Sequence, residues 1–162
     1  MIEIRPARTG DRAAVRALLA AGHLHYFRDP LPEESLEAAA ADILDRRSCT
    51  MLLLLAEGEQ AGFATYTILQ ASPNGHGVLF LKDLFLKEAW RGGGLGRQVM
   101  AHLAGIAQDH GCARLDWTTE TDNPGAMRLY ERLGADVVTE KVYYRVLAKD
   151  LARFRKRCGI SS

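Results

Sequence analysis

The sequence has little of what marks secreted, membrane-bound or disulfide-stapled proteins. Its three cysteines, Cys49, Cys112 and Cys158, are an odd number without CxxC spacing, which argues against a disulfide framework and favours a reducing compartment. The longest apolar run, Met51 to Ala56, is far shorter than the ~20 residues that a membrane-spanning helix needs. The N-terminus also lacks an apolar stretch of signal-peptide length. We therefore expect a cytoplasmic protein without a membrane partner.

The sequence also has almost no excess of charge of either sign. The formal net charge is +1, so the molecule has no overall field that would hold a polyanion. The one basic run is Arg153, Arg155, Lys156 and Arg157, which with Lys149 reads as the solvated face of a last helix, a binding patch being the alternative. No nucleic-acid partner is expected.

Motifs for covalent and metal chemistry are absent as well. No serine or cysteine stands in a nucleophile motif, so an acyl-enzyme intermediate is not expected. His23 and His25 have HxH spacing, but no nearby residue completes a metal-ligand set. We therefore expect no metal site.

Apolar periodicity predicts alternating strands and helices in one domain, residues 1–162, of the α/β class. The expected helices begin at Thr9 or Asp11, after Pro32, at Leu95 and at Asn123, and a last helix carries the basic run. A turn is expected at Ser72 to Gly75. The expected strands are 2–6, 51–57, 61–70, 78–86, 114–119 and 142–147.

A glycine-rich turn, Arg91-Gly92-Gly93-Gly94-Leu95-Gly96-Arg97, stands between a predicted strand and a predicted helix. Glycines at a helix start let the backbone approach a ligand closely and leave the first N–H groups of the helix unpaired. Because a helix N-terminus carries about half a positive charge, these amides can hold a pyrophosphate together with Arg91 and Arg97. A merely flexible turn is the alternative, since glycine is common in tight loops.

Two common phosphate loops do not fit this turn. A GxGxxG fingerprint starting at Gly92 or Gly94 would need glycine where Arg97 or Val99 stands. A Walker loop would need Gly-Lys-Ser/Thr after the glycines, and none follows. What remains is the pattern RxxGxG.

The pattern RxxGxG, with its apolar strand and amphipathic helix, resembles the pyrophosphate loop of the GNAT superfamily of N-acetyltransferases. The stretch from Asn123 to Ala135 is similar to that family's second cofactor motif, N…A…LY…LGA. Ile4-Arg5-Pro6-Ala7, Gly62-Phe63-Ala64 and Tyr143-Tyr144-Arg145 also look familial, so the resemblance covers nearly the whole chain. Within the superfamily the sequence is most similar to the diamine (spermidine/spermine-like) and the small histone and polyamine acetyltransferases.

The resemblance implies a GNAT fold, with a central mixed, mostly antiparallel sheet flanked by helices, and direct transfer of an acetyl group from acetyl-CoA to a primary amine. In the family an exposed backbone N–H of the fourth strand stabilises the oxyanion, and Tyr130 stands at the proton-donor position for the leaving thiolate. By helical spacing alone Tyr130 reads as a core aromatic, and Asn123 as an N-cap. The residues that the resemblance assigns to acetyl-CoA are Leu84, Phe85, Leu86, Arg91, Gly92, Gly93, Gly94, Leu95, Gly96, Arg97, Asn123, Pro124, Gly125, Ala126 and Tyr130.

The base that deprotonates the amine is harder to assign. An amine with a pKa of about 10.4 is protonated at neutral pH, so its proton must leave before the nitrogen attacks the thioester. Asp83, in the predicted central strand, would have a raised pKa if buried and could then accept that proton. A paired structural aspartate is the equal alternative.

The acceptor positions depart from the polyamine-acetylating relatives. Those relatives carry a glutamate where Lys82 stands, and another acidic residue where this chain has His25 and Tyr26. Because a cation repels a cationic substrate, Lys82 favours an acceptor with a carboxylate, such as an amino acid or its analogue. The argument fails if Glu33, Glu34 and Glu37 take over the recognition.

Other functions remain open from the sequence. The domain can be a protein acetyltransferase acting on lysines or N-termini, or an acyl-CoA sensor without catalysis. The resemblance also implies a homodimer formed through late strands, here around Val142 to Leu147. The sequence identifies neither the acceptor amine nor the length of the acyl donor.

Overall fold

The computed structural model describes residues 1–70 and 76–159. Its centre is a sheet with the strand order β1-β2-β3-β4-β5. The pairs β1/β2, β2/β3 and β3/β4 are antiparallel, and the pair β4/β5 is parallel. This arrangement confirms the expected α/β fold with a mixed, mostly antiparallel sheet. The strands are β1 (Ile2–Pro6), β2 (Thr50–Ala56), β3 (Glu59–Leu69), β4 (Gly77–Leu86) and β5 (Cys112–Trp117).

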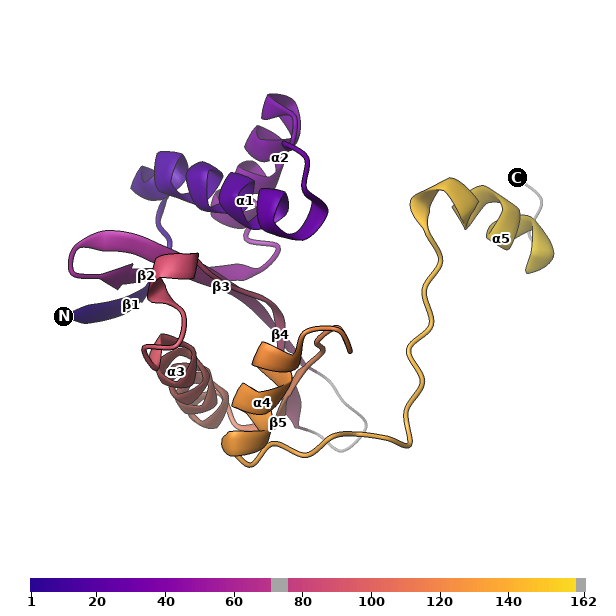
Figure 1. Cartoon of the computed structure of the whole chain (residues 1–162). Coiled ribbons are helices and arrows are strands. Elements are labelled where there is room, and N and C mark those ends of the chain that lie inside the picture. Colours follow the sequence, from indigo (N-terminus) through magenta and orange to yellow (C-terminus); the bar gives the residue numbers. More distant parts are fainter. Residues whose placement is uncertain (71–75, 160–162) are drawn as a thin grey trace.

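Helices cover both faces of the sheet. Figure 1 shows α1 and α2 on one face and α3 and α4 on the other. No helix in the described part of the chain has the length and apolar character to cross a membrane. The helices are α1 (Arg12–Phe27), α2 (Glu33–Leu44), α3 (Leu95–Asp109), α4 (Pro124–Arg132) and α5 (Leu151–Arg157), with short 3₁₀ segments η1 (Thr9–Asp11), η2 (Glu88–Trp90) and η3 (Ala148–Asp150).

The core has two layers, one on each face of the sheet. Strand β2 contributes to both, because successive side chains of a strand point to opposite faces. Leu52 and Leu54 pack in the layer under α3, whereas Met51 and Leu53 pack in the layer under α1 and α2. All four side chains are buried, which explains why this strand reads as a continuous apolar run.

Close approach of backbones fixes the middle of the sheet. A Cβ atom at Gly62 would lie 2.1 Å from the carbonyl oxygen of Phe85 on β4. A Cβ atom at Gly22 of α1 would meet the ring of Phe63 at 3.0 Å. Glycine at these two positions lets α1 and β4 pack tightly against β3.

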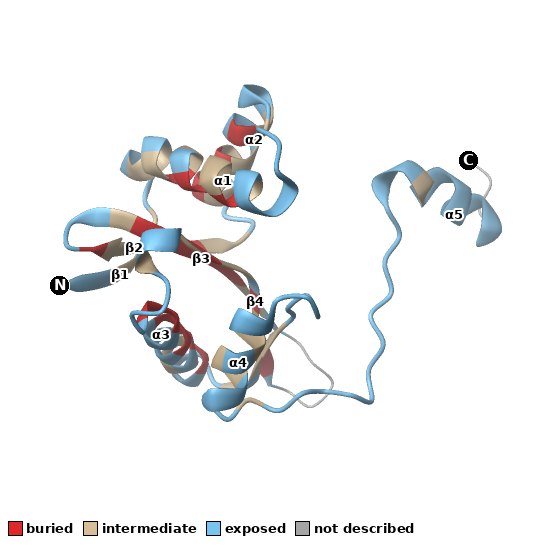
Figure 2. Cartoon of the chain, viewed as in Figure 1, coloured by how far each residue is buried: buried red, intermediate tan, exposed pale blue. Residues whose placement is uncertain are grey.

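The predicted strand at Val142 to Leu147 is wrong for this structure. Residues 135–147 lie outside helices and strands and are almost all exposed, and the chain runs from α4 away from the sheet to α5 (Figures 1 and 2). The alternating apolar pattern is present, but no neighbouring strand pairs with it in the described chain. A strand needs such a partner for its backbone hydrogen bonds.

Two further expectations differ in detail. The strand expected at 114–119 begins and ends two residues earlier, because β5 stays in register with β4 only as far as Trp117. The helix expected to run to Arg46 and Arg47 ends at Leu44. The turn predicted at Ser72 to Gly75 lies outside the described residues.

Candidate active site

The sheet opens between β4 and β5. Their last paired residues are Leu81 and Trp117, while β4 continues for five residues to Leu86. The register between β3 and β4 shifts at this point, so that Lys82 is an extra residue in β4. Such a bulge bends a strand and ends pairing. It accounts for the separation of β4 and β5 beyond Leu81 and Trp117, which is called the gap below.

The gap bares backbone groups of β4. The N–H of Lys87 donates to the Ala61 carbonyl on β3 at 2.9 Å, so Lys87 and alternate residues before it face β3. The backbone N–H and C=O groups of Leu84 and Leu86 therefore point to the open side of β4. Their carbonyls accept side-chain hydrogen bonds there, from Tyr26 at 3.4 Å and from Arg91 at 2.9 Å. A ligand entering the gap meets the N–H groups of the same two residues.

The glycine-rich turn leads into α3, as predicted. Gly92 and Gly94 have φ of +78° and +86°, a conformation that costs a residue with a side chain about 1–2 kcal/mol. No backbone hydrogen bond inside the described chain uses the N–H groups of Gly92 to Arg97. Space for a Cβ atom is open at Gly92, Gly93 and Gly94. The unpaired amides of Gly92, Gly93, Gly94 and Arg97 belong to exposed residues, as an anion site requires, whereas Leu95 and Gly96 are buried.

Gly96 has a packing role in the same turn. A Cβ atom there would lie 3.0 Å from Cδ2 of Leu129 on α4. The missing side chain lets the start of α3 approach α4, so the turn and α4 form one edge of the gap.

Arg91 points back toward α1. Its Nε atom donates to the Leu86 carbonyl, and Nη2 lies 3.2 Å from Nε2 of His25. Burial, followed by the charges of Arg91 and Arg28, lowers the pKa of His25, which keeps its ring neutral at pH 7. Arg91 therefore ties the end of α1 to the end of β4, while Arg97 is exposed at the helix start.

Tyr130 lies on α4 and faces the gap. Its ring contacts the ring of Trp117 edge-on, with 5.0 Å between centroids, and packs against the core layer under α3. Burial, and then the nearby Tyr26, raises the pKa of the Tyr130 hydroxyl. The group therefore stays protonated at neutral pH and can donate a proton. Trp117, which orients this ring, was not among the predicted site residues, and its place at a strand end gave no signal.

Asn123 acts as the N-cap of α4. Its Oδ1 atom accepts a hydrogen bond from the N–H of Ala126 at 3.1 Å, and Pro124 fills the first helical position. The side-chain NH₂ of Asn123 remains available to a ligand. Gly125 and Ala126 follow in the first turn of the same helix.

Asp83 is paired and partly exposed. Its Oδ2 atom accepts a hydrogen bond from the buried hydroxyl of Thr65 and lies 3.3 Å from Nζ of Lys82. The side chain is 36% exposed, so the burial that would raise its pKa is incomplete, and the pairing agrees with the alternative of a structural aspartate. Thr65 was missed, since nothing in a strand sequence shows which threonine faces a carboxylate.

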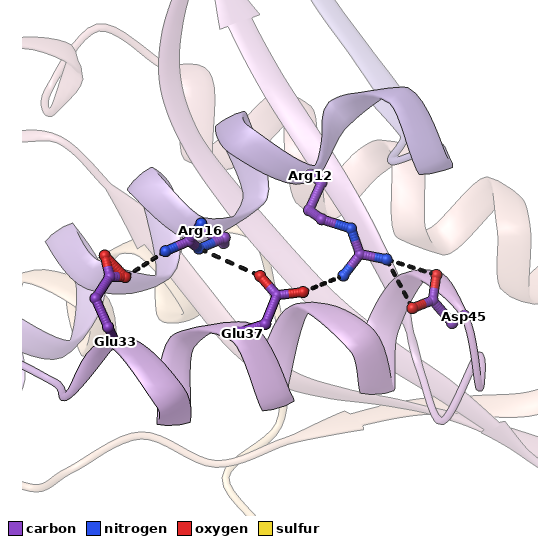
Figure 3. Close-up of polar contacts among 5 residues, drawn as sticks. All are labelled: Arg12, Arg16, Glu33, Glu37 and Asp45. Atoms are coloured by element: carbon purple, nitrogen blue, oxygen red, sulfur yellow. Dashed lines mark hydrogen bonds and ion pairs between the residues drawn. The ribbon is translucent and has the colours of Figure 1, made fainter.

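The acidic residues of α2 are bound by arginines of α1 (Figure 3). Glu37 lies 2.7 Å from Arg12 and 3.6 Å from Arg16, and Arg16 also contacts Glu33. Arg12 further pairs with Asp45 at 2.6 Å. Of the three glutamates whose recognition of a cationic acceptor would defeat the charge argument, Glu33 and Glu37 are therefore already ion-paired.

The structure thus brings most of the predicted residues to one gap. Its walls are the end of β4, the turn before α3 and the start of α4, with His25 and Tyr26 covering it from α1. Burial and then the charge of Asp83 raise the pKa of Tyr26, which places that hydroxyl near the carboxylate. No cluster of histidine, cysteine and acidic side chains within residues 1–70 and 76–159 has the geometry for a metal ion.

Comparison with known proteins agrees with this geometry. The family model described as "Acetyltransferase (GNAT) family" matches residues 16–135, most of the chain. A thialysine N-epsilon-acetyltransferase of Bos taurus is 28% identical over 86% of both chains. An aminoglycoside N(6')-acetyltransferase of Stenotrophomonas maltophilia is 27% identical over 88% of this chain and 92% of its own. A spermine/spermidine N(1)-acetyltransferase of Bacillus subtilis is 28% identical over 82% and 86%.

A solved structure is similar over nearly the whole chain. An integron cassette protein from the mobile metagenome of V. cholerae superimposes with a TM-score of 0.86 at 33% identity, covering 96% of this chain and 98% of its own. The match to the family model, together with the bared amides and the tyrosine at the gap, assigns the chain to the GNAT acetyltransferase family, and it is an acetyl-CoA-dependent N-acetyltransferase.

Proposed function

We propose that this enzyme acetylates the primary amine of a small molecule that also carries a carboxylate, such as an amino acid or its analogue. The observation that carries the proposal is the ammonium group of Lys82, which is largely exposed at the bulge where the gap opens. Glu33 and Glu37 are held by arginines and leave little free negative charge for a polyamine. A relative that acetylates thialysine, an analogue of lysine, supports the same class of acceptor.

The proposed reaction is direct transfer. The acceptor ammonium first loses a proton to solvent water, and Oδ1 of the partly exposed Asp83 relays it, because the contacts of Asp83 with Thr65 and Lys82 both use Oδ2. The amine nitrogen then attacks the thioester carbonyl, and the new C–N bond places negative charge on the carbonyl oxygen. The backbone N–H of Leu84 or of Leu86 stabilises that charge, whereas that of Phe85 faces β3.

The same reaction ends at α4. When the intermediate collapses, the attacking nitrogen loses its second proton to water, the C–S bond breaks and the thiolate of coenzyme A leaves. The hydroxyl of Tyr130, which is protonated at neutral pH, gives its proton to that sulfur, and the phenolate then takes a proton from water. The products are the N-acetyl amine and free coenzyme A.

Binding of the donor is proposed to follow the walls of the gap. Gly92 to Arg97 hold the pyrophosphate through their N–H groups, and Asn123 to Ala126 contact the pantetheine arm. His25 and Tyr26 border the acceptor side. We further propose that the chain acts as a single domain, as a homodimer and in the cytoplasm.

Turnover on a panel of amines tests the acceptor. Release of free thiol from acetyl-CoA is measured with lysine and thialysine as carboxylate-bearing amines, and with spermidine and an aminoglycoside as polycations. We expect the amino acids to be the better acceptors. Efficient turnover of spermidine by the unaltered enzyme would overturn the charge argument.

A charge series at one position separates recognition from catalysis. Lys82→Glu should raise the KM for the amino acid roughly tenfold or more, the effect of about 1.4 kcal/mol of lost attraction. Lys82→Met is the matched control, because it removes the charge without adding repulsion. Its KM for the amino acid should lie between those of the wild type and Lys82→Glu. Affinity for coenzyme A should be the same in all three proteins.

A further inference from the structure

The side chain of Arg91 joins three elements around the gap. The residue directly precedes Gly92 and so begins the glycine-rich turn. Its Nε atom donates to the Leu86 carbonyl at the end of β4 at 2.9 Å, and its Nη2 atom lies 3.2 Å from Nε2 of His25 on α1. Figure 1 shows α1 and α3 on opposite faces of the sheet, so this bond connects a helix on one face with the turn that starts a helix on the other.

The bond to Arg91 sets the protonation of the His25 ring. A guanidinium group has donors only, so Nε2 of His25 must accept, and the proton of the neutral ring lies on Nδ1. The ring also contacts the rings of Phe85 on β4 and of Tyr26, with 5.7 Å and 5.1 Å between centroids. Contacts from α1 and β4 thus hold the imidazole where it can accept from Arg91.

The surroundings of His25 favour its neutral form. Burial lowers the pKa of His25, the charges of Arg91 and Arg28 lower it further, and Glu88 of η2 acts in the opposite direction. Tyr26 is uncharged at neutral pH, because its own pKa is raised. An imidazolium ring would have no acceptor left for Arg91 and would face it with a like charge. The bond therefore exists only while His25 is neutral.

The turn that follows Arg91 needs an anchor. Gly92, Gly93 and Gly94 have the largest backbone freedom of any residue type, and ordering them around a ligand costs entropy. Open space surrounds their Cβ positions, so no neighbouring side chain holds them in place. The far end of the turn is fixed by the packing of Gly96 against α4. The bonds of Arg91 fix its near end.

We propose that His25 is a positioning residue that acts through Arg91: its neutral ring holds the Arg91 side chain, and thereby the glycine-rich turn, in the conformation that binds coenzyme A. Gain of a proton by His25 breaks this link and weakens donor binding. The inference rests on the proposed place of the diphosphate at the turn, and it does not depend on which amine is acetylated.

The first test observes the ring itself. Long-range ¹H–¹⁵N spectra of ¹⁵N-labelled protein without ligand show which ring nitrogen carries the proton, and the signals that vanish in His25→Gln belong to His25. Expected at pH 7 are a bare Nε2 and a proton on Nδ1. Titration should give a pKa below 6.5, and Arg91→Gln should raise it, because a positive charge is removed. A ring protonated at Nε2 at pH 7 would contradict the proposal.

Two variants separate the acceptor atom from the ring. His25→Phe keeps a ring against Phe85 but has no acceptor for Arg91, whereas His25→Gln keeps an acceptor and does not titrate. Calorimetry at pH 7 should give a Kd for coenzyme A about two- to fivefold higher in His25→Phe than in the wild type. This is the lower half of what one hydrogen bond contributes, because His25 is exposed.

His25→Gln should restore the wild-type affinity for coenzyme A. Unchanged affinity in His25→Phe would show that the bond does not position the turn. An equal loss in both variants would assign the effect to the ring contacts and would likewise contradict the proposal.

The pH dependence of the same affinity gives a result that a purely structural role would not. From pH 7 to pH 5 the wild type should lose about two- to fivefold more affinity for coenzyme A than His25→Gln, because only the wild-type residue gains a proton. Titration of the phosphates of the ligand is common to both proteins and cancels in this comparison. His102→Gln, on the exposed face of α3, is the matched control and should follow the wild type.

Parallel profiles of the wild type and His25→Gln would rule out the link. A relative gain of affinity by the wild type at pH 5 would also rule it out, since the imidazolium would then attract the diphosphate itself.

Failure of this proposal and failure of the proposed function give different results. Unchanged coenzyme A affinity in the His25 variants, together with weakened binding in Gly94→Ala, would overturn the role of His25 alone. Wild-type affinity in Gly94→Ala would instead overturn the turn as the diphosphate site. Turnover of spermidine bears only on the acceptor.

Discussion

At the scale of single residues, the environment of one hydroxyl and of one carboxylate decides what each can do. Tyr130 is held against Trp117 and keeps its proton because burial disfavours the phenolate. Asp11, at the other side of the molecule, is held in its ionised form by Arg5 through two hydrogen bonds of 2.7 and 2.8 Å. We propose that the first residue serves the reaction and that the second serves stability.

Removal of the Tyr130 hydroxyl should slow the reaction without weakening donor binding. A positioned general acid contributes about 10²–10⁴-fold, so Tyr130→Phe should lower kcat by at least about 100-fold with little change in coenzyme A affinity. Thiol release and calorimetry measure the two quantities. Tyr66→Phe, which removes a hydroxyl from the core on β3, is the control that should retain turnover. Equal rates for the Tyr130 variant and the wild type would rule out the proposed proton donor.

Asp11 makes stability depend on pH in the acid range. The hydrogen bonds from Arg5, followed by that from the Arg8 backbone, lower the pKa of Asp11 from 3.8 to about 2, although burial acts in the opposite direction. Because the folded state favours the ionised form, this stabilisation is complete above pH 4 to 5 and disappears as the pH falls toward 2.

Asp11→Asn should therefore lower the free energy of unfolding by about 1 to 2 kcal/mol at pH 7, with a shrinking difference from wild type below pH 4. Urea unfolding at several pH values measures the effect. A difference that stays constant down to pH 2 would contradict the role of the ionised carboxylate.

At the scale of elements, the proposed binding of coenzyme A depends on the backbone conformation of the turn before α3. Gly94 is the N-cap of that helix with φ of +86°, so its backbone conformation and the free amides after it depend on each other. Gly105 lies in the middle of the same helix with open space around its Cβ position. The two glycines differ in function although both belong to one element.

Alanine at these two positions should have opposite effects. Gly94→Ala should destabilise the protein by about 1–2 kcal/mol and weaken coenzyme A binding, because the turn must change to relieve the left-handed conformation. Gly105→Ala should stabilise it by about 0.5–1 kcal/mol and leave binding unchanged. Thermal unfolding and calorimetry distinguish these outcomes. Wild-type affinity in Gly94→Ala would argue against the turn as the diphosphate site.

At the scale of the whole molecule, residues 1–135, the body, and residues 136–159, the arm, differ in how they are stabilised. The body has two core layers and a continuous sheet, whereas the arm has neither. If the arm folds onto a second copy, the folded state is a dimer, and mass action then couples stability to protein concentration.

The midpoint of thermal unfolding should accordingly rise with concentration for the wild type. For Val142→Asp with Val146→Asp it should not change over the same range, since its copies no longer associate. Calorimetric scans across about two decades of concentration would measure this, with Val142→Thr/Val146→Thr as the control that follows the wild type. A midpoint independent of concentration in the wild type would count against an obligate dimer.

The sequence by itself determined the order of elements from β1 to α4, the glycine-rich turn before α3 and the family. These features are local: apolar period, glycine at a helix start and a capped helix with Tyr130 act through residues close in the chain. It also supplied the strand pattern at Val142 to Leu147, but a pattern states only that a segment can pair.

Tertiary structure decided the rest, because those features need partners distant in sequence. The gap exists since β5 stops opposite Leu81, and Asp83 is paired because Thr65 faces it across the sheet. Glu33 and Glu37 of α2 are ion-paired because α1 brings arginines to them. The late strand pattern found no partner in the described part of its own chain, because the path of the chain after α4 leads away from the sheet (Figure 1).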